Sequence, residues 1–218
     1  MKNFFYSFLA LLISLSLYTV YNRNNKAKHP IQKTVIKSVS PPKKLDTILI
    51  VTMNFNEKYL LETIGKKVTD FYHLPVKYQE SYLPQFAYYA ERNRFRADSL
   101  ISYLKHINNG KYKFVAGLTS KDISCTNESN PDWGVFGLGS LDYSGCITST
   151  FRLKKGVTVQ KLTDRLEKVV LHEIGHNNGL QHCTTLSPCF MKAADGTISE
   201  VDSEPMDICN SCKNKLNG

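Results

Sequence analysis

Three histidines and one glutamate stand close together in the segment HEIGHNNGLQH. On a helix, His172 and His176 are four residues apart and lie on one face, where two imidazoles can bind the same metal ion. Glu173 is rotated by about 100° from His172, which places it beside this row and near a metal-bound water. Gly179 stands where the helix would end in a left-handed residue, and a reversal there brings His182 back as a third ligand. The pattern predicts zinc with an open fourth position and Glu173 as the general base.

The length of the pattern decides how specific it is. A bare H-E-x-x-H also occurs on ordinary, partly exposed helices. The full H-E-x-x-H-x-x-G-x-x-H, with its glycine at the end of a predicted helix, is a much stronger signal for a zinc peptidase.

Four cysteines follow the histidines, at Cys183, Cys189, Cys209 and Cys212. The last two form a C-x-x-C, and Met191 stands two residues after Cys189. Four thiolates in two pairs have the number and spacing of a structural tetrahedral zinc site. In an exported protein the same set would indicate disulfides, and Cys125 with Cys146 could form a further one. Because C-x-x-C suits a metal-binding turn better than a structural disulfide, we favour a second zinc ion.

The segment from His172 to Cys212 resembles the signature of the archaemetzincin family. That signature runs H-E-x-x-H-x-x-G-x-x-H-C, a short gap, C-x-M, seventeen residues and C-x-x-C, and Lys192–Ile208 is the seventeen-residue spacer here. The stretches ILIVTM and VFGLGSLDYSGCITSTFRL are also similar to the family's preceding core, so the resemblance covers roughly residues 46–216. The gap Thr184–Pro188 is one residue longer than the family usually has, an insertion that a turn absorbs at little entropic cost.

The resemblance implies a role for each of these residues. It makes Glu173 the catalytic base that activates a zinc-bound water, and Met191 the methionine of a turn beneath the catalytic metal. It implies two zinc ions per chain, a catalytic one on His172, His176 and His182 and a structural one on Cys183, Cys189, Cys209 and Cys212. The implied activity is that of a zinc metallopeptidase acting on peptide or protein substrates.

The elements that must position these residues follow from hydrophobic periodicity. DTILIVTM (Asp46–Met53) predicts a buried strand, and the spacing of Leu60, Ile64, Val68 and Phe71 predicts an amphipathic helix after it. Further on, the sequence predicts a strand at Val76–Tyr82, a helix around Phe95–Ile107, a strand in KYKFVAGLTS, and two strands or a hairpin in WGVFGLGSLDYSG and CITSTFRL.

One apolar stripe then continues from about Thr158 to Asn178 and predicts the helix that carries the histidines. The fold class expected is α/β (α+β): a compact metzincin-like domain with a mixed, twisted sheet, an active-site helix and a zinc-stabilised C-terminal subdomain.

The first 44 residues have a different character. MKNFFYSFLALLISLSLYTV contains an uncharged run from Phe4 to Val20, which predicts a signal peptide or membrane anchor over residues 1–21. Residues 22–44 predict a basic disordered tether, followed by the metallopeptidase domain at 45–218. We therefore favour an exported or membrane-anchored protein with its domain outside the cytoplasm. An uncleaved anchor with the basic flank in the cytoplasm is the alternative.

The net charge of +9 does not indicate a nucleic-acid partner, because of where the charge lies. Of 28 Lys and Arg, eight fall in residues 1–44, which contain no Asp or Glu, so 20 basic side chains accompany 19 acidic ones from Leu45 onward. We expect a monomer that binds no nucleic acid and meets the membrane only through an uncleaved N-terminal segment. Two other hypotheses stay open: a zinc-stabilised peptide-binding or structural module with little turnover, and a membrane-tethered electrostatic binder that uses the basic tail.

Overall fold

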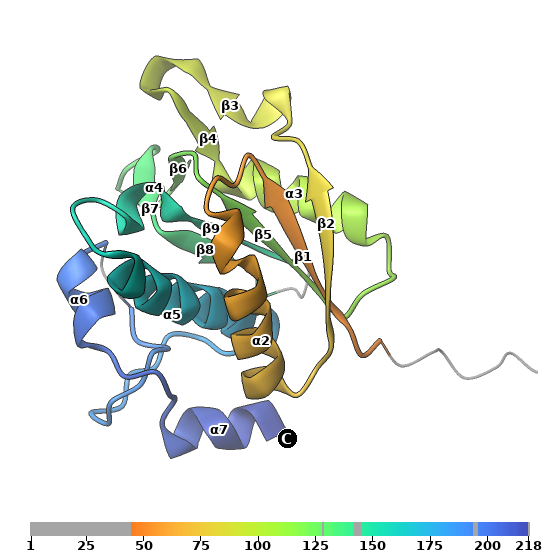
Figure 1. Ribbon diagram of the computed structural model, residues 1–218. Coiled ribbons are helices and arrows are strands. Elements are labelled where there is room, and N and C mark those ends of the chain that lie inside the picture. Colours follow the sequence, from red (N-terminus) through yellow and green to blue (C-terminus); the bar gives the residue numbers. More distant parts are fainter. Residues whose placement is uncertain (1–44, 128, 142–144, 194–195, 218) are drawn as a thin grey trace, which may run out of the picture. The chain divides into compact units, whose positions relative to one another are not determined.

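The apolar run ILIVTM forms strand β1 (Ile48–Met53), in which every residue is buried. It belongs to a five-stranded sheet with the order β2-β1-β5-β9-β8. Neighbouring strands run parallel except at the edge, where β8 is antiparallel to β9. The other strands of this sheet are β2 (Val76–Ser81), β5 (Phe114–Thr119), β8 (Gly137–Gly139) and β9 (Cys146–Ser149) (Figure 1).

The structure, a computed structural model, describes residues 45–127, 129–141, 145–193 and 196–217. The segments predicted as a signal or anchor (1–21) and as a tether (22–44) lie outside these residues. The domain boundary at residue 45 therefore stays a prediction.

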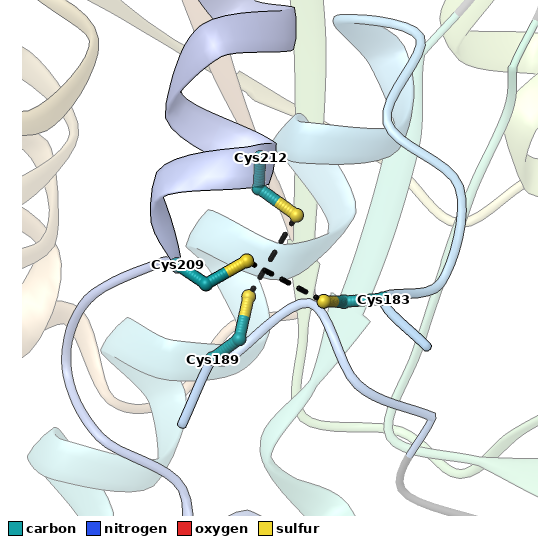
Figure 2. A group of neighbouring side chains, drawn as sticks. All are labelled: Cys183, Cys189, Cys209 and Cys212. Atoms are coloured by element: carbon teal, nitrogen blue, oxygen red, sulfur yellow. Dashed lines mark hydrogen bonds between the residues drawn. The ribbon is translucent and has the colours of Figure 1, made fainter. Parts of the chain in front are cut away.

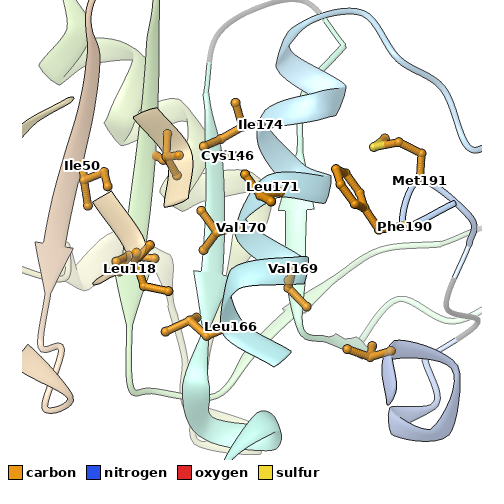
Figure 3. Packing of buried hydrophobic residues seen from close by; sticks show 14 of the residues in the cluster. Ile50, Leu118, Cys146, Leu166, Val169, Val170, Leu171, Ile174, Phe190 and Met191 are labelled. Atoms are coloured by element: carbon orange, nitrogen blue, oxygen red, sulfur yellow. The ribbon is translucent and has the colours of Figure 1, made fainter. Parts of the chain in front are cut away.

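Helices cover both faces of the sheet because its inner strands are apolar on both sides. Ile50 of β1 packs in one hydrophobic cluster with α2 (Leu61–Tyr72) and α5 (Val159–Asn177), as Figure 3 shows around Leu118 and Leu166. The neighbouring residues along the strand point to the opposite face. Leu49 accordingly packs in a second cluster with α3 (Ala97–Asn108). This mixed α/β architecture confirms the predicted fold class.

Helix α5, which carries the histidines, begins and ends as its sequence predicts. The Thr158 hydroxyl caps its first turn by accepting the Lys161 N–H at 3.3 Å. At its other end Gly179 has φ +81°, and its N–H donates to the carbonyl of His176 at 2.8 Å. The left-handed glycine turns the chain back toward the helix.

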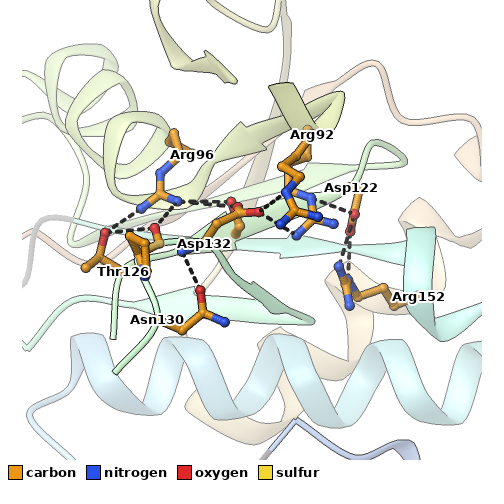
Figure 4. A network of polar contacts seen from close by, with 10 residues as sticks. Arg92, Arg96, Asp122, Thr126, Asn130, Asp132 and Arg152 are labelled. Atoms are coloured by element: carbon orange, nitrogen blue, oxygen red, sulfur yellow. Dashed lines mark hydrogen bonds and ion pairs between the residues drawn. The ribbon is translucent and has the colours of Figure 1, made fainter. Parts of the chain in front are cut away.

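A second, four-stranded sheet was not predicted; its order is β3-β4-β6-β7 and its strands are β3 (Tyr88–Tyr89), β4 (Arg94–Arg96), β6 (Ile123–Cys125) and β7 (Trp133–Val135). Arginine–aspartate pairs hold it together (Figure 4). Asp132 accepts a hydrogen bond from Arg94 at 3.2 Å, and Asp122 accepts one from Arg152 at 2.7 Å. These side chains are mostly screened from water, which makes such paired hydrogen bonds stronger.

The predicted strand over CITSTFRL is wrong in its second half. Strand β9 ends at Ser149, and Thr150–Leu153 form the short helix α4. The Ser149 hydroxyl accepts the Phe151 N–H at 3.1 Å and so caps a helix within a segment whose alternation is typical of a strand.

The C-terminal part of the described chain contains two short helices, α6 (Ile198–Ser203) and α7 (Asn210–Asn217). Three single 3₁₀ turns complete the elements found in the described residues: η1 (Lys58–Leu60), η2 (Gln85–Ala87) and η3 (Ala90–Arg92). Within the described ranges, no helix combines the length and the apolar character needed to cross a membrane.

Candidate active site and metal centres

The three predicted histidines converge, with one nitrogen from each lying within 4.8 Å of the others. His172 and His176 come from successive turns of α5, and their Nε2 atoms are 3.0 Å apart. His182 follows the glycine turn, with its ring centroid 5.3 Å from that of His172 and 4.9 Å from that of His176. Nitrogens bound tetrahedrally to zinc at their usual bond length are about 3.3 Å apart. The arrangement therefore fits a zinc ion held by three imidazoles.

Backbone carbonyls orient two of these rings. The Nδ1 of His172 lies 2.6 Å from the Phe190 carbonyl oxygen, and the Nδ1 of His176 lies 2.7 Å from that of Leu180. A carbonyl can only accept, so each Nδ1 carries the proton and each Nε2 keeps its lone pair for a metal. Burial, with the neighbouring His176 ring, lowers the pKa of His172 to about 3, so its ring stays neutral, as a metal ligand must be.

Glu173 is buried against edge strand β8. The Gly139 N–H donates a hydrogen bond to its carboxylate, while burial has the larger effect and raises the pKa of Glu173 to about 8. The strand approaches so closely that a Cβ on Gly137 would lie 2.6 Å from Oε1 of Glu173. The G-L-G sequence of β8 thus makes room for the carboxylate beside the three histidines.

Met191 lies beneath the histidine helix. It is fully buried, and a Cβ on Gly175 would lie 2.5 Å from its Sδ. Its carbonyl oxygen accepts the Cys183 N–H at 2.7 Å. The methionine turn and the loop that presents His182 are therefore joined by their backbones.

The four C-terminal cysteines also converge, and Figure 2 shows their sulfurs pointing toward a common centre. The Sγ atoms of Cys183 and Cys209 are 3.6 Å apart, and those of Cys189 and Cys212 are 3.8 Å apart. Sulfurs bound tetrahedrally to zinc are about 3.8 Å apart, whereas a disulfide needs about 2 Å. All four are free thiols, so the geometry fits a metal ion and not two disulfides.

Two further observations bear on the thiols. Hydrogen bonds, first from the Thr185 hydroxyl and then from the Cys212 N–H, lower the pKa of Cys209 to about 6, which favours the thiolate that binds metal. Cys125 and Cys146 are also free and belong to different hydrophobic clusters on opposite faces of the main sheet. The possible disulfide between them is not formed.

A cleft of about 680 Å³ lies over the histidines. Strands β7 and β8 line one side, and α5 lines another through Lys168, Val169, His172, Glu173 and His176. The segment after α5 contributes residues that include Gln181, His182, Val201 and Glu204. An extended chain can therefore reach the predicted metal ligands along β8.

Several residues of this site were not identified from the sequence. The orienting groups on Phe190 and Leu180 are backbone carbonyls, which every residue type offers, so no sequence signal marks them. Gly137 and Gly139 stand in the predicted strand segment WGVFGLGSLDYSG, and two glycines at alternate positions of a strand are a sign of close approach. Lys168 and Glu204, at the far end of the cleft, gave no signal.

Comparison with known proteins agrees with this geometry. A family model described as peptidase family M54 matches residues 146–218. The chain is 32% identical to the archaemetzincin of Haloquadratum walsbyi over 147 residues, which is 64% of this chain and 80% of that protein. It is 31% identical to the archaemetzincin of Nanoarchaeum equitans over 172 residues, 78% of this chain and 89% of that protein.

Solved structures give the same result. The archaemetzincin of Archaeoglobus fulgidus, in a complex with malonate, superposes with a TM-score of 0.67 at 26% identity, covering 78% of this chain and 99% of that one. The archaemetzincin of Methanopyrus kandleri gives 0.68 at 26% identity, covering 82% and 97%.

Fold, histidine site and relatives together define a zinc metalloprotease that acts on peptide bonds. The chain belongs to the archaemetzincin family.

The expectation of an exported or membrane-anchored protein is corrected by these findings. The archaeal relatives match the chain over its metalloprotease part, and within the described residues no helix can span a membrane. The physical reason is plain in α5, the longest of the described helices at 19 residues, which carries charged side chains along its whole length. The hydrophobic run on which the expectation was based lies outside the described residues.

Proposed function

We propose that His172, His176 and His182 hold the catalytic zinc of this metallopeptidase and that Glu173 is its general base. The observation that carries the proposal is the position of the Glu173 carboxylate. It is buried beside three converging imidazole nitrogens, within the cleft, and is fixed by the Gly139 N–H. A base must lie within reach of the proton that it removes, and this carboxylate borders the open side of the histidine site.

The chemistry divides between the ion and the chain. Zinc, when bound, supplies a Lewis acid that polarises the scissile carbonyl and acidifies the attacking water. Glu173 takes the proton from that water at its carboxylate and passes it to the leaving amine. A carboxyl group can make both transfers, because it accepts the proton as a carboxylate and releases it again as the neutral acid. Gly139 keeps the carboxylate oriented through both steps.

We further propose a second, structural zinc on Cys183, Cys189, Cys209 and Cys212. It would tie α7 and the residue before it to Cys183, the neighbour of His182, and to Cys189, two residues before Met191, and so brace the third catalytic ligand. Met191, packed against Gly175, supports the same loop from below. We keep the expectation that the enzyme works as a monomer.

Glu173→Gln tests the base. The amide has the size of the carboxyl and cannot accept the proton, so hydrolysis of a broad peptide library should be lost. The zinc content should stay at two ions per chain, measured on protein purified under non-oxidising conditions. Full activity in this variant would end the proposal for Glu173, and one zinc with no free thiols would end the proposal for the cysteines.

A further inference from the structure

The cleft does not stop at the zinc ligands but continues along α5 toward the start of that helix. Beyond His172 it is lined by Val169 and Lys168, and across from them by Val201 and Glu204. Lys168 precedes His172 by four residues, a distance of about 6 Å along the helix axis. This end of the cleft therefore lies about one substrate side chain away from the reacting bond.

Glu204 is held in place by its backbone. It follows α6 as the C-cap, its N–H donates to the Glu200 carbonyl at 3.1 Å, and its φ and ψ of −71° and 146° lead into Pro205. Its side chain is half-buried in the cleft wall. Among the described residues, none donates a hydrogen bond to its carboxyl or forms an ion pair with it.

The cations on the nearby part of α5 already have acceptors. Arg165 and Lys161 both pair with Asp202, at 2.7 Å and 3.0 Å. Lys168 donates to the Val201 carbonyl oxygen at 2.9 Å. Glu204 is thus a carboxyl without a hydrogen-bond or ion-pair partner among the described residues, and Lys168 and Lys192 act on it only from beyond ion-pair distance.

Burial also changes the pKa of this carboxyl. Desolvation raises the pKa of Glu204 to about 7, against the opposing effects of Lys168 on α5 and Lys192 in the loop after Met191 and with a smaller contribution from Glu200 on α6. A half-buried carboxyl of this kind gains most from a partner that brings both a positive charge and hydrogen-bond donors.

We propose that Glu204 binds the arginine or lysine side chain of a peptide substrate at this end of the cleft. Val169 and Val201 contact the aliphatic stem of that side chain, while the guanidinium or ammonium group reaches the carboxylate. The inference rests on the proposed function, because it assigns a substrate preference to the same cleft. Glu204 itself takes no part in the proposed proton transfer or zinc binding.

Binding can be measured without turnover. Trp133 is the single tryptophan of the chain, lines the cleft and is 40% exposed, so its fluorescence reports a bound peptide. The protein used is the zinc-loaded Glu173→Gln variant. The probes are pairs of peptides in which one member has arginine and the other has citrulline, its uncharged isostere, at the same position. That position is moved in turn to each site around the cleaved bond. At one position the arginine peptide should bind about tenfold more tightly, the effect of one charge-assisted hydrogen-bonded contact.

Two further variants on the same background assign the effect. Glu204→Gln should remove the preference for arginine. Glu200→Gln should keep it, because Glu200 lies on α6, just before Glu204, accepts a hydrogen bond from Thr197 at 2.6 Å and is not part of the cleft lining. The ratio of the two affinities should also grow as the pH rises from 6 to 8, because Glu204 ionises in that interval, and it should not change in Glu204→Gln.

The outcomes separate this inference from the proposed function. Equal or absent binding of both peptides at every position, or an arginine preference that survives in Glu204→Gln, overturns the inference, even if the wild-type enzyme cleaves peptides through Glu173. An arginine preference that depends on Glu204, in a wild-type enzyme that hydrolyses no peptide, supports the inference and overturns the proposed general base.

Discussion

The histidine cluster and the cysteine cluster meet at two adjacent residues, His182 and Cys183, yet they are built in opposite ways. Two of the three histidines stand on a 19-residue helix that belongs to the main core. Their rings are oriented by hydrogen bonds to carbonyls, and His182 is exposed at the cleft. The cysteines come from the loop after α5 and from α7 and its lead-in, and three of the four are buried.

From this difference we infer what each site would require from a metal. The histidine nitrogens are held close together by packing and hydrogen bonds within the domain, so a metal there adds chemistry to a surface that is already formed. The residues around the cysteines have little regular structure of their own, and α6 and α7 are only 6 and 8 residues long. Short helices of that length are unstable alone, so we expect the second metal to be needed for folding of this part of the chain.

The largest effect should follow from breaking the cysteine site. In Cys212→Ser the second zinc should be lost and the free energy of unfolding should fall by more than about 4 kcal/mol, since loss of a structural metal is among the most destabilising changes known. Urea unfolding followed by circular dichroism, with zinc analysis, measures both. Cys125→Ala, in the other hydrophobic cluster, is the control and should keep two zincs. A Cys212→Ser protein with normal stability would show that the cysteines do not fold this segment.

Breaking the histidine site should instead leave the fold intact. His182 is exposed, so His182→Ala should change the free energy of unfolding by less than about 1 kcal/mol. Peptide hydrolysis should fall by about 10³-fold or more, because the catalytic ion loses one of three ligands. Zinc analysis should find the cysteine-bound ion still present. A loss of stability as large as in Cys212→Ser would mean that the two sites fold as one unit.

The same contrast explains how much the sequence predicted. Candidate metal ligands are side chains at fixed spacings, so the sequence predicted His172, His176 and the C-x-x-C as donors, and the structure brings these side chains close together. Helix α5 was also predicted, because it is long enough to show its period, and strand β1 was predicted from its short β-branched apolar run. The second sheet was missed, since strands of two or three residues such as β3 and β4 show no period at all.

The groups that position the active-site side chains were harder to predict from the sequence than the proposed ligands. Whether the Phe190 carbonyl faces His172 depends on the path of the loop, which the type of residue 190 does not determine. The close approach of β8 to Glu173 joins segments more than thirty residues apart and left only two glycines as a sign. Contacts of this kind come from tertiary packing, and local sequence specifies them weakly.

Substitutions in β8 can displace Glu173 without changing a proposed zinc ligand, and so test whether the histidine site is preformed. A Cβ on Gly137 would meet the Glu173 side chain at 2.6 Å, whereas a Cβ on Gly139 would meet the Glu173 backbone oxygen at 2.5 Å. Gly137→Ala should therefore lower kcat by about 10- to 100-fold, since a shift of about 1 Å in a catalytic group has effects of that size. The KM and the zinc content should change little. Gly139→Ala must move the strand and should also destabilise the fold. An unchanged kcat in both variants would show that β8 does not position the base.

The smallest effect concerns the link between the two regions. Asp202 on α6 accepts hydrogen bonds from Arg165 on α5 at 2.8 and 2.7 Å, and Lys161 lies 3.0 Å away. The Arg165 hydrogen bonds lower the pKa of Asp202 to about 2, and a depressed carboxyl pKa stabilises the fold above the ordinary value of 3.8 and loses that effect as the pH falls toward 2. Asp202→Asn should cost about 1–2 kcal/mol.

Asp202 loses its stabilising effect only below about pH 4. The difference in unfolding free energy between wild type and Asp202→Asn should therefore be the same at pH 8 and pH 5.5. Asp70→Asn is the matched control, since Asp70 pairs with Lys66 on the exposed side of α2 and should contribute less than about 0.5 kcal/mol. Urea unfolding at the two pH values measures all three proteins. If the difference in unfolding free energy is smaller at pH 5.5 than at pH 8, the effect comes from a neighbouring group that titrates near neutral pH and not from Asp202 itself. Glu204 is such a group. A constant difference leaves α5 and α6 joined by a permanent ion pair, with Glu204 beside it as the group that changes its charge.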